Sequence, residues 1–114
     1  MPYIGVKTTK EISAEKESAL KAELGKAIET FPGKSEAWLM TEFSGGCRLW
    51  MRGDNSEDSA FVEVKIFGKI EHRSCDAMTG KLCGILSSCL GISPDRIYVT
   101  YSGYSEWGWN GGNF

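Results

Sequence analysis

Apolar residues recur along this chain at two spacings, and each spacing predicts one type of element. In SAFVEVKIF, the residues Ala60, Val62, Val64 and Ile66 alternate with those of a second face, which is the two-residue period of a β-strand. Other short runs rich in apolar and β-branched residues predict further strands. The predicted strands are residues 3–8, 37–43, 59–67 and 96–101, with a short one at 47–51 behind a turn at 44–46.

Two other segments repeat their apolar residues every three or four positions, which is the period of an amphipathic helix. The first helix is predicted over about residues 14–30, with Ser13 as its N-cap and Pro32–Gly33 as its stop. The second is predicted over about residues 74–90 and ends at Gly91.

These elements follow in the order strand–helix–strand, loop, strand–helix–strand, in two halves of nearly equal length. Each half is a βαβ unit, whose crossover is right-handed. We therefore predict an α+β fold with two layers, in which tandem βαβ units form a four-stranded sheet with both helices on one face. A chain of 114 residues suits a single domain spanning residues 1–114. The aromatic, turn-rich residues 105–114 predict a small terminal hairpin.

Helices on one face leave the other face of the sheet uncovered. That face is predicted to mix large apolar side chains with charges, and it is not expected to lie fully in water. The simplest way to cover this face is self-association of several chains around a shared axis. The residues assigned to this face are Trp38, Met40, Phe61 and Phe67, beside Glu42, Glu63 and Lys65.

Composition and charge narrow the classes of function. The net charge of −2 implies no general affinity for nucleic acid or for an anionic membrane. No apolar stretch reaches the ~20 residues of a membrane span, and the first residues do not form a signal peptide, so a cytoplasmic protein is expected. The four cysteines are not spaced like a zinc site or a disulfide framework, so reduced thiols and no metal are expected, with Cys47 as the most exposed thiol.

The opening MPYIGVKT contains one candidate for acid–base chemistry. If Met1 is removed, the nitrogen of Pro2 becomes a free secondary amine, and burial among apolar side chains lowers the pKa of an amine. Such an amine can take a proton from carbon and return it elsewhere, and Lys34 is placed to hold a carboxylate. Taken alone, each residue also fits a plainer role, with Pro2 starting a strand and Lys34 lying solvated in a loop.

Several motifs in order give the sequence a specific resemblance. They are the opening Met-Pro, FPGKSEAWLM (31–40), FGKI (67–70), KLCGILSSCLGISPDRIYVTY (81–101) and WGWNGGNF (107–114). With these motifs the chain resembles the macrophage migration inhibitory factor family of the tautomerase superfamily over nearly its whole length. The resemblance implies a homotrimer whose sites lie between adjacent subunits.

The resemblance assigns three residues to the reacting centre. Pro2 matches the N-terminal proline that serves as the general base, and Lys34 matches the lysine that binds the substrate carboxylate. Phe67 takes the position whose backbone N–H helps to hold that carboxylate, and a backbone donor tolerates the change from the isoleucine of many relatives.

Five further residues are expected to line the pocket by the same resemblance. Trp38 replaces a tyrosine of the pocket wall, Trp109 lies where an aromatic residue closes the pocket, and Tyr3 is expected at its mouth. Tyr98 matches a tyrosine contributed by the neighbouring subunit. Thr100 stands where relatives often have asparagine, so that polar contact differs here.

The expected activity is keto–enol tautomerisation of phenylpyruvate-like α-keto acids, with dopachrome as a second substrate of the family type. No cofactor or metal is expected, because the base and the electrostatic clamp are both provided by the protein. The alternative is a cytokine-like signalling protein, secreted by a non-classical route, that binds a host receptor. A third reading, an oligomer with neither activity, stays open because a family fixes the fold better than the function.

The chain departs from the family in its third loop. The CxxC of mammalian relatives is absent, with Ser59 and Val62 at those positions, so no thiol oxidoreductase activity is transferred. A charged segment at 47–58 replaces the usual glycine-serine one. Within it, the RGD at 52–54 is expected to be a chance match, and His72 is expected to be an exposed histidine without a catalytic role.

Overall fold

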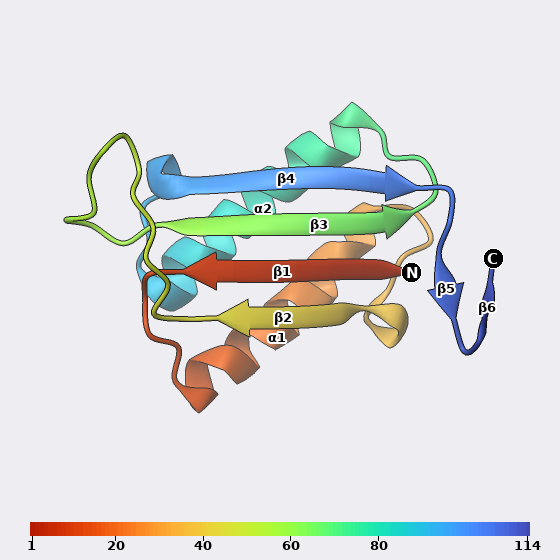
Figure 1. The fold of residues 1–114 in the computed structure, drawn as a ribbon, viewed down its shortest axis with the longest axis horizontal. Coiled ribbons are helices and arrows are strands. Elements are labelled where there is room, and N and C mark those ends of the chain that lie inside the picture. The colour runs from red at the N-terminus through yellow and green to blue at the C-terminus, as the bar shows by residue number, and fades with distance from the viewer.

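Two helices lie across one face of a four-stranded sheet in the computed structural model, which describes residues 1–114 (Figure 1). A two-stranded hairpin follows at the C-terminus and stands beyond the end of the sheet (Figure 1). The elements are β1 (Pro2–Thr8), α1 (Ala14–Ala27), β2 (Met40–Ser44), β3 (Ala60–Phe67), α2 (His72–Leu90), β4 (Ile97–Tyr104), β5 (Gly108–Trp109) and β6 (Gly112–Asn113), with 3₁₀ turns at Ile28–Thr30, Glu36–Trp38 and Pro94–Arg96.

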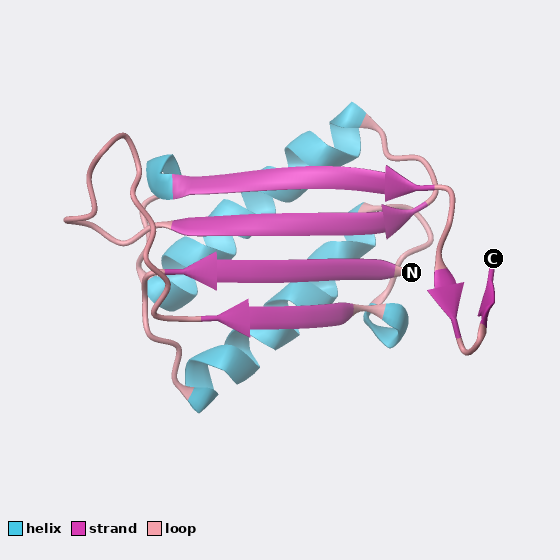
Figure 2. Ribbon diagram, viewed as in Figure 1, coloured by secondary structure: helices cyan, strands magenta, loops and turns pink.

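The sheet has the strand order β2-β1-β3-β4. β1 is parallel to β2, β3 is parallel to β4, and the two halves meet where β1 and β3 run antiparallel. The predicted tandem βαβ architecture is therefore confirmed, and both helices lie behind the sheet in the view of Figure 2.

The core lies between the sheet and the helices. Alternate residues of β1 and β3 pack against the apolar stripes of α1 and α2, as the two-residue and 3.6-residue periods predict. The helix boundaries agree closely with the prediction: α1 tightens into a 3₁₀ turn before Phe31, and α2 begins at His72. The fully buried side chains include Ile4, Val6, Leu20, Leu24, Val62, Ile66, Leu82 and Leu86.

The strand predicted at 37–43 begins later than expected, at Met40. The backbone N–H groups of Trp38 and Leu39 donate to the carbonyls of Ser35 and Glu36, at 3.3 and 3.1 Å, so this apolar stretch first makes a turn. Trp38 consequently lies ahead of the sheet instead of on its open face, and 52% of its surface is exposed.

The short strand predicted at 47–51 is absent, and that prediction is wrong. The segment forms a tight hairpin tip in which Met51 pairs with Asp54. Arg52 and Gly53 both have positive φ angles, of 51° and 73°, so the chain reverses before a longer ladder can form.

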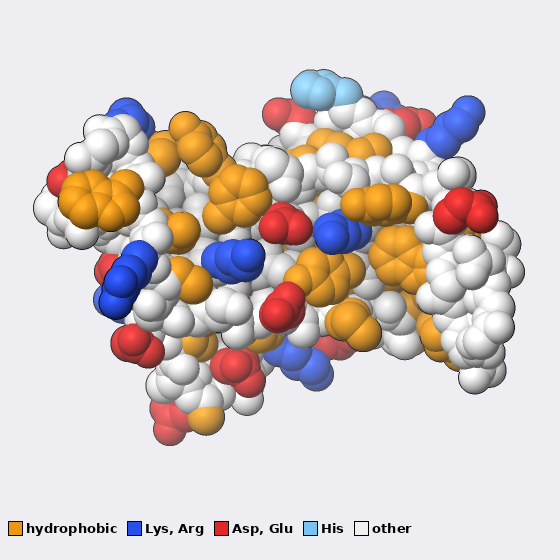
Figure 3. All heavy atoms as spheres, in the orientation of Figure 1, with side chains coloured by type: hydrophobic (Ala, Val, Ile, Leu, Met, Phe, Trp, Pro, Cys, Tyr) orange, Lys and Arg blue, Asp and Glu red, His pale blue; other side chains and the backbone are white.

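The open face of the sheet mixes apolar and charged side chains, as predicted. Figure 3 views the molecule from this side and shows hydrophobic side chains interspersed with basic and acidic ones. Met40 and Tyr98 are among its most exposed large side chains. No helix of the structure has both the length and the apolar character needed to cross a membrane.

Candidate active site

The start of β1 meets three other segments at one end of the sheet. Pro2 pairs with Ile66, so the last residue of β3, Phe67, lies beside the N-terminus. The loop after α1 carries Lys34 to the same end, and the β5–β6 hairpin stands next to it (Figure 1). Three of the sequence-predicted residues therefore come together here from three separate parts of the chain.

A chain of two hydrogen bonds connects these segments. The Phe67 N–H donates to the Met1 carbonyl at 3.0 Å, and the Lys34 ammonium donates to the Phe67 carbonyl at 2.9 Å. Because the Met1 carbonyl carbon is bonded to the Pro2 nitrogen, amide dimensions place that nitrogen within ~5 Å of the Phe67 nitrogen. The proline nitrogen, a backbone donor and a lysine thus share one small region.

The electrostatics of this region favour a neutral amine. Burial lowers the pKa of the Met1 α-amine, and the positive charge and contact of Lys34 lower that pKa further. With Met1 in place, the Pro2 nitrogen is a tertiary amide without a basic lone pair. Pro2 itself is buried at the first position of its strand, where the missing N–H costs little.

Four aromatic side chains form a wall beside the N-terminus, which we call the aromatic wall: Trp38, Phe67, Trp109 and Phe114. The rings of Trp38 and Trp109 meet edge to face at 5.2 Å, and Phe114 lies 5.4 Å from Phe67 and 6.3 Å from Trp109. About half of the surface of Trp38, Trp109 and Phe114 is exposed, at 52%, 52% and 55%. Exposed rings around a polar centre suit an aromatic ligand.

Phe114 was not among the residues predicted from the sequence. Its backbone N–H donates to the Trp107 carbonyl at 3.1 Å, which closes the terminal hairpin and turns the last ring back to Trp109. The signal was present in the sequence, because the tail WGWNGGNF places its last aromatic residue after a run of turn formers.

A cavity of about 190 Å³ opens beside Lys34, between the α1–β2 and β3–α2 connections. Its walls combine buried apolar residues with charged ones: Phe31, Pro32, Lys34, Ile66, Lys69, Ile70, Glu71 and Ser74. A larger groove of about 680 Å³ runs between α1 and α2, but it contains none of the predicted site residues. We therefore place the candidate site at the start of β1.

Tyr98 and Thr100 lie away from this site within one chain. Tyr98 pairs with Phe61, five positions along β3 from the Ile66 that faces Pro2. At ~3.3 Å per residue, that separation is about 16 Å along the strands. The structure of one chain does not bring these two residues to Pro2.

Tyr3 also points away from Pro2, along the open face. Its hydroxyl donates to the Glu42 carboxylate, and this bond, ahead of burial, raises the pKa of Tyr3 to about 12. The Lys65 ammonium lies 5.6 Å from the centre of the Tyr3 ring. These contacts make Tyr3 part of the surface network of the sheet.

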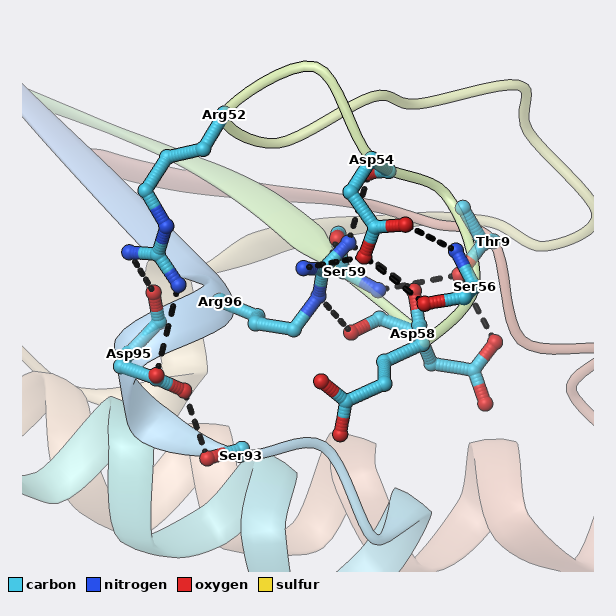
Figure 4. Close-up of polar contacts among 10 residues, drawn as sticks. Thr9, Arg52, Asp54, Ser56, Asp58, Ser59, Ser93, Asp95 and Arg96 are labelled. Carbon is cyan, nitrogen blue, oxygen red and sulfur yellow. Dashed lines mark hydrogen bonds and ion pairs between the residues drawn. The ribbon is translucent and has the colours of Figure 1, made fainter.

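At the opposite end of the sheet, Arg96 anchors the charged loop (Figure 4). Its guanidinium is 3% exposed and bonds the Asp54 carboxylate at 3.3 Å, the Ser59 hydroxyl at 3.1 Å and three backbone carbonyls. Arg52 bonds Asp95 at 3.4 Å. Both charged side chains of the RGD are thus engaged within the chain, which agrees with a chance match to the integrin-binding tripeptide.

All four cysteines are free and half-buried, and the Cys47 thiol donates to the Ser44 carbonyl at 3.4 Å. Burial raises the pKa of the Cys75 and Cys83 thiols. No group of three or more His, Cys, Asp or Glu residues is placed to hold a metal ion, and His72 is exposed at the start of α2.

The fold and this N-terminal site define a class of small α+β proteins, and comparison with known proteins identifies its family. The sequence model described as macrophage migration inhibitory factor (MIF) matches residues 1–114. The chain therefore belongs to the macrophage migration inhibitory factor family.

Individual relatives align with this chain over nearly its full length. The chain is 30% identical to macrophage migration inhibitory factor of Meriones unguiculatus over 116 aligned positions, which cover 100% of this chain and 99% of the relative. The crystal structure of Leishmania major MIF2 has a TM-score of 0.92 at 29% identity, covering 100% and 97%. The homologue from Prochlorococcus marinus has a TM-score of 0.82 at 29% identity, covering 98% of both chains.

Proposed function

We propose that the chain is a keto–enol tautomerase of phenylpyruvate-like α-keto acids, with Pro2 as the general base. Membership of the macrophage migration inhibitory factor family supports an enzyme of the tautomerase type. The observation that carries the finer proposal is the convergence of the Pro2 nitrogen, the Phe67 N–H and the Lys34 ammonium at one end of the sheet.

The base requires removal of Met1. Hydrolysis by an aminopeptidase adds one water across the Met1–Pro2 bond, releases methionine and leaves Pro2 with a secondary amine. The burial and the Lys34 charge that lower the pKa of the Met1 amine would act on the Pro2 amine as well. A neutral Pro2 nitrogen can then take a proton from C3 of the α-keto acid and become an ammonium. This ammonium returns the proton to the carbonyl oxygen, which forms the enol and restores the neutral amine.

The substrate is held by the groups around that nitrogen. Lys34 and the freed Phe67 N–H would bind the carboxylate, and the aromatic wall would pack against the phenyl ring. The acid–base group and the clamp belong to the chain itself, so the proposal uses no cofactor or metal.

We further propose that residues 1–114 act as one domain that assembles into a homotrimer. The mixed open face and the distance of Tyr98 and Thr100 from Pro2 support this assembly, because a neighbouring copy would supply both residues to the site. A cytoplasmic location, secretion, dopachrome turnover and a host receptor stay predictions from the resemblance. No contact in the structure favours the signalling role over the enzyme.

The test is an enol-formation assay with phenylpyruvate on protein whose intact mass shows that Met1 is absent. Lys34→Ala should raise KM more than it lowers kcat, because the lysine binds the carboxylate in both ground and transition states. Lys26→Ala is the matched control, since that exposed lysine on α1 pairs only with Glu23. A Met1-free protein without measurable turnover would overturn the proposed function.

A further inference from the structure

We infer that Met1 is itself an occupant of the anion site, so that its removal opens the site to carboxylates as well as creating the base. This inference rests on the proposed function for the identity of the ligand. It concerns binding, which can be measured without turnover.

The Phe67 amide already has a hydrogen-bond partner. In the structure, this N–H donates to the Met1 carbonyl at 3.0 Å. A backbone N–H is a single donor, and its main acceptor here is an oxygen of the residue to be removed. A carboxylate oxygen of a ligand cannot take this donor while the Met1 carbonyl holds it.

The Met1 amine lies near the second group of the proposed anion site, Lys34. Lys34 lies close enough to lower the pKa of that amine by both its charge and a hydrogen-bond contact. The Met1 carbonyl therefore occupies the Phe67 donor, and the Met1 amine lies near the Lys34 ammonium, close to both groups proposed to bind the substrate. The position of Met1 matches the place that the proposed carboxylate needs.

The pairing of β1 within the sheet does not include Met1. β1 begins at Pro2, whose pairing with Ile66 belongs to the ladder that continues to Thr8. Met1 lies outside that strand and is half-buried. Removing it should therefore leave the fold unchanged, free the Phe67 donor and open space beside Lys34.

These contacts distinguish two effects of processing. Acylation of Pro2 alone would make the protein a poor catalyst that still binds carboxylates. Occupation of the anion site makes the unprocessed protein unable to bind them well. We expect the unprocessed form to be a correctly folded protein that does not recognise the substrate class.

The experiment compares two preparations of the full chain. One is expressed normally and the other with methionine aminopeptidase inhibited, and intact mass verifies each. The probe is 3-phenylpropionate, which has the phenyl ring and carboxylate of phenylpyruvate but no ketone, and calorimetry measures its Kd. Loss of a hydrogen bond to a charged ligand predicts about 10- to 100-fold weaker binding by the Met1-retaining form.

Introducing Lys34→Ala into both preparations gives four proteins, with and without Met1 and with and without the lysine. Comparing their four Kd values identifies the site that Met1 blocks. The substitution should weaken binding to the Met1-free form but have little further effect on the Met1-retaining form, since Met1 already occupies the region. Lys26→Ala should change neither Kd. Amide exchange gives a ligand-free readout, because the Phe67 N–H should be protected only while Met1 is present.

Equal Kd values for the two preparations, or no binding by either, would overturn the inference. Its failure is distinct from failure of the proposed function. If the Met1-free form binds the probe more tightly but does not turn over phenylpyruvate, the proposed function fails and the occupied anion site stands.

Discussion

The two ends of the sheet carry polar groups in opposite states of pairing. Where β3 begins, the Arg96 guanidinium is almost fully buried, and every one of its nitrogens donates to the loop beside it. Where β1 begins, the Lys34 ammonium has one carbonyl partner and no carboxylate partner. Large aromatic side chains at that second end are about half exposed.

This difference separates residues that stabilise the fold from residues that are free to bind a ligand. A buried charge whose every nitrogen donates within the chain fixes a loop and has little left to offer a ligand. An ammonium has three donors, so Lys34 keeps capacity for an incoming anion. The comparison therefore predicts that substitutions at the Arg96 end change stability, while substitutions at the Pro2 end change activity.

The largest effect should come from Pro2→Gly in Met1-free protein. This change replaces the rigid secondary amine by a flexible primary amine, and loss of a positioned general base lowers turnover by about 100-fold or more. The phenylpyruvate assay measures the rate, and circular dichroism checks the fold. An unchanged kcat/KM would remove Pro2 from the mechanism.

At the other end, Arg96→Met should lower the free energy of unfolding by about 3 kcal/mol, because several loop carbonyls lose their donor. Urea unfolding at fixed protein concentration measures the change. Arg52→Met is the matched control, since the exposed pair of Arg52 with Asp95 should contribute less than about 1 kcal/mol. Equal losses in the two variants would contradict the structural role assigned to Arg96.

Trp109→Ala should raise KM for phenylpyruvate about tenfold with a smaller change in kcat, because it removes the ring that joins Trp38 and Phe114 in the aromatic wall. Trp107→Ala is the control from the same tail, since the Trp107 ring contacts Tyr104 instead. If both variants raise KM by the same factor, the aromatic wall does not bind the phenyl ring of the substrate.

Lys34→Gln should shift the acid limb of the kcat/KM profile to higher pH. Removing the positive charge stabilises the ammonium form of Pro2, so its pKa rises and more alkaline solution is needed to free the base. Steady-state kinetics across the neutral range measure the shift. Lys26→Gln should leave the limb in place, and an unmoved limb in Lys34→Gln would show that this charge does not act on the base.

The smallest effect should be local to the charged loop. Hydrogen bonds from the Ser56 hydroxyl and then its backbone N–H lower the pKa of the Asp54 carboxyl. Ser56→Ala should move that pKa up towards its ordinary value, with turnover unaffected. Carbon-detected NMR titration of Asp54 checks it. A pKa that stays low would assign the effect to the backbone N–H of residue 56 and to the neighbouring arginines instead of the hydroxyl.

Much of the fold could be predicted because its signals are local. The alternation from Ala60 to Ile66 predicted the buried face of β3. The turn-forming residues after each helix predicted where the chain returns to the sheet. The equal halves then predicted the tandem βαβ order. Two errors arose where apolar residues form turns, at Glu36–Trp38 and around Met51. There, backbone bonds across three or four residues outweigh strand propensity.

The candidate site was predictable in part. Pro2, Lys34 and Phe67 could be proposed from the sequence through the family resemblance, and the structure brings them to one end of the sheet. Residue types alone do not show that Met1 contacts the Phe67 amide. The contacts of Arg96 were also hidden, because its partners lie 37–42 positions earlier in the chain.

The most direct test of the account is the ¹⁵N chemical shift of Pro2 as a function of pH, in protein labelled at proline and expressed from its own start codon. The account predicts an amine resonance that titrates below the pKa of an ordinary secondary amine and moves to higher pH in Lys34→Gln. An amide resonance that does not change with pH would contradict it, because Pro2 would then have no lone pair to act as a base.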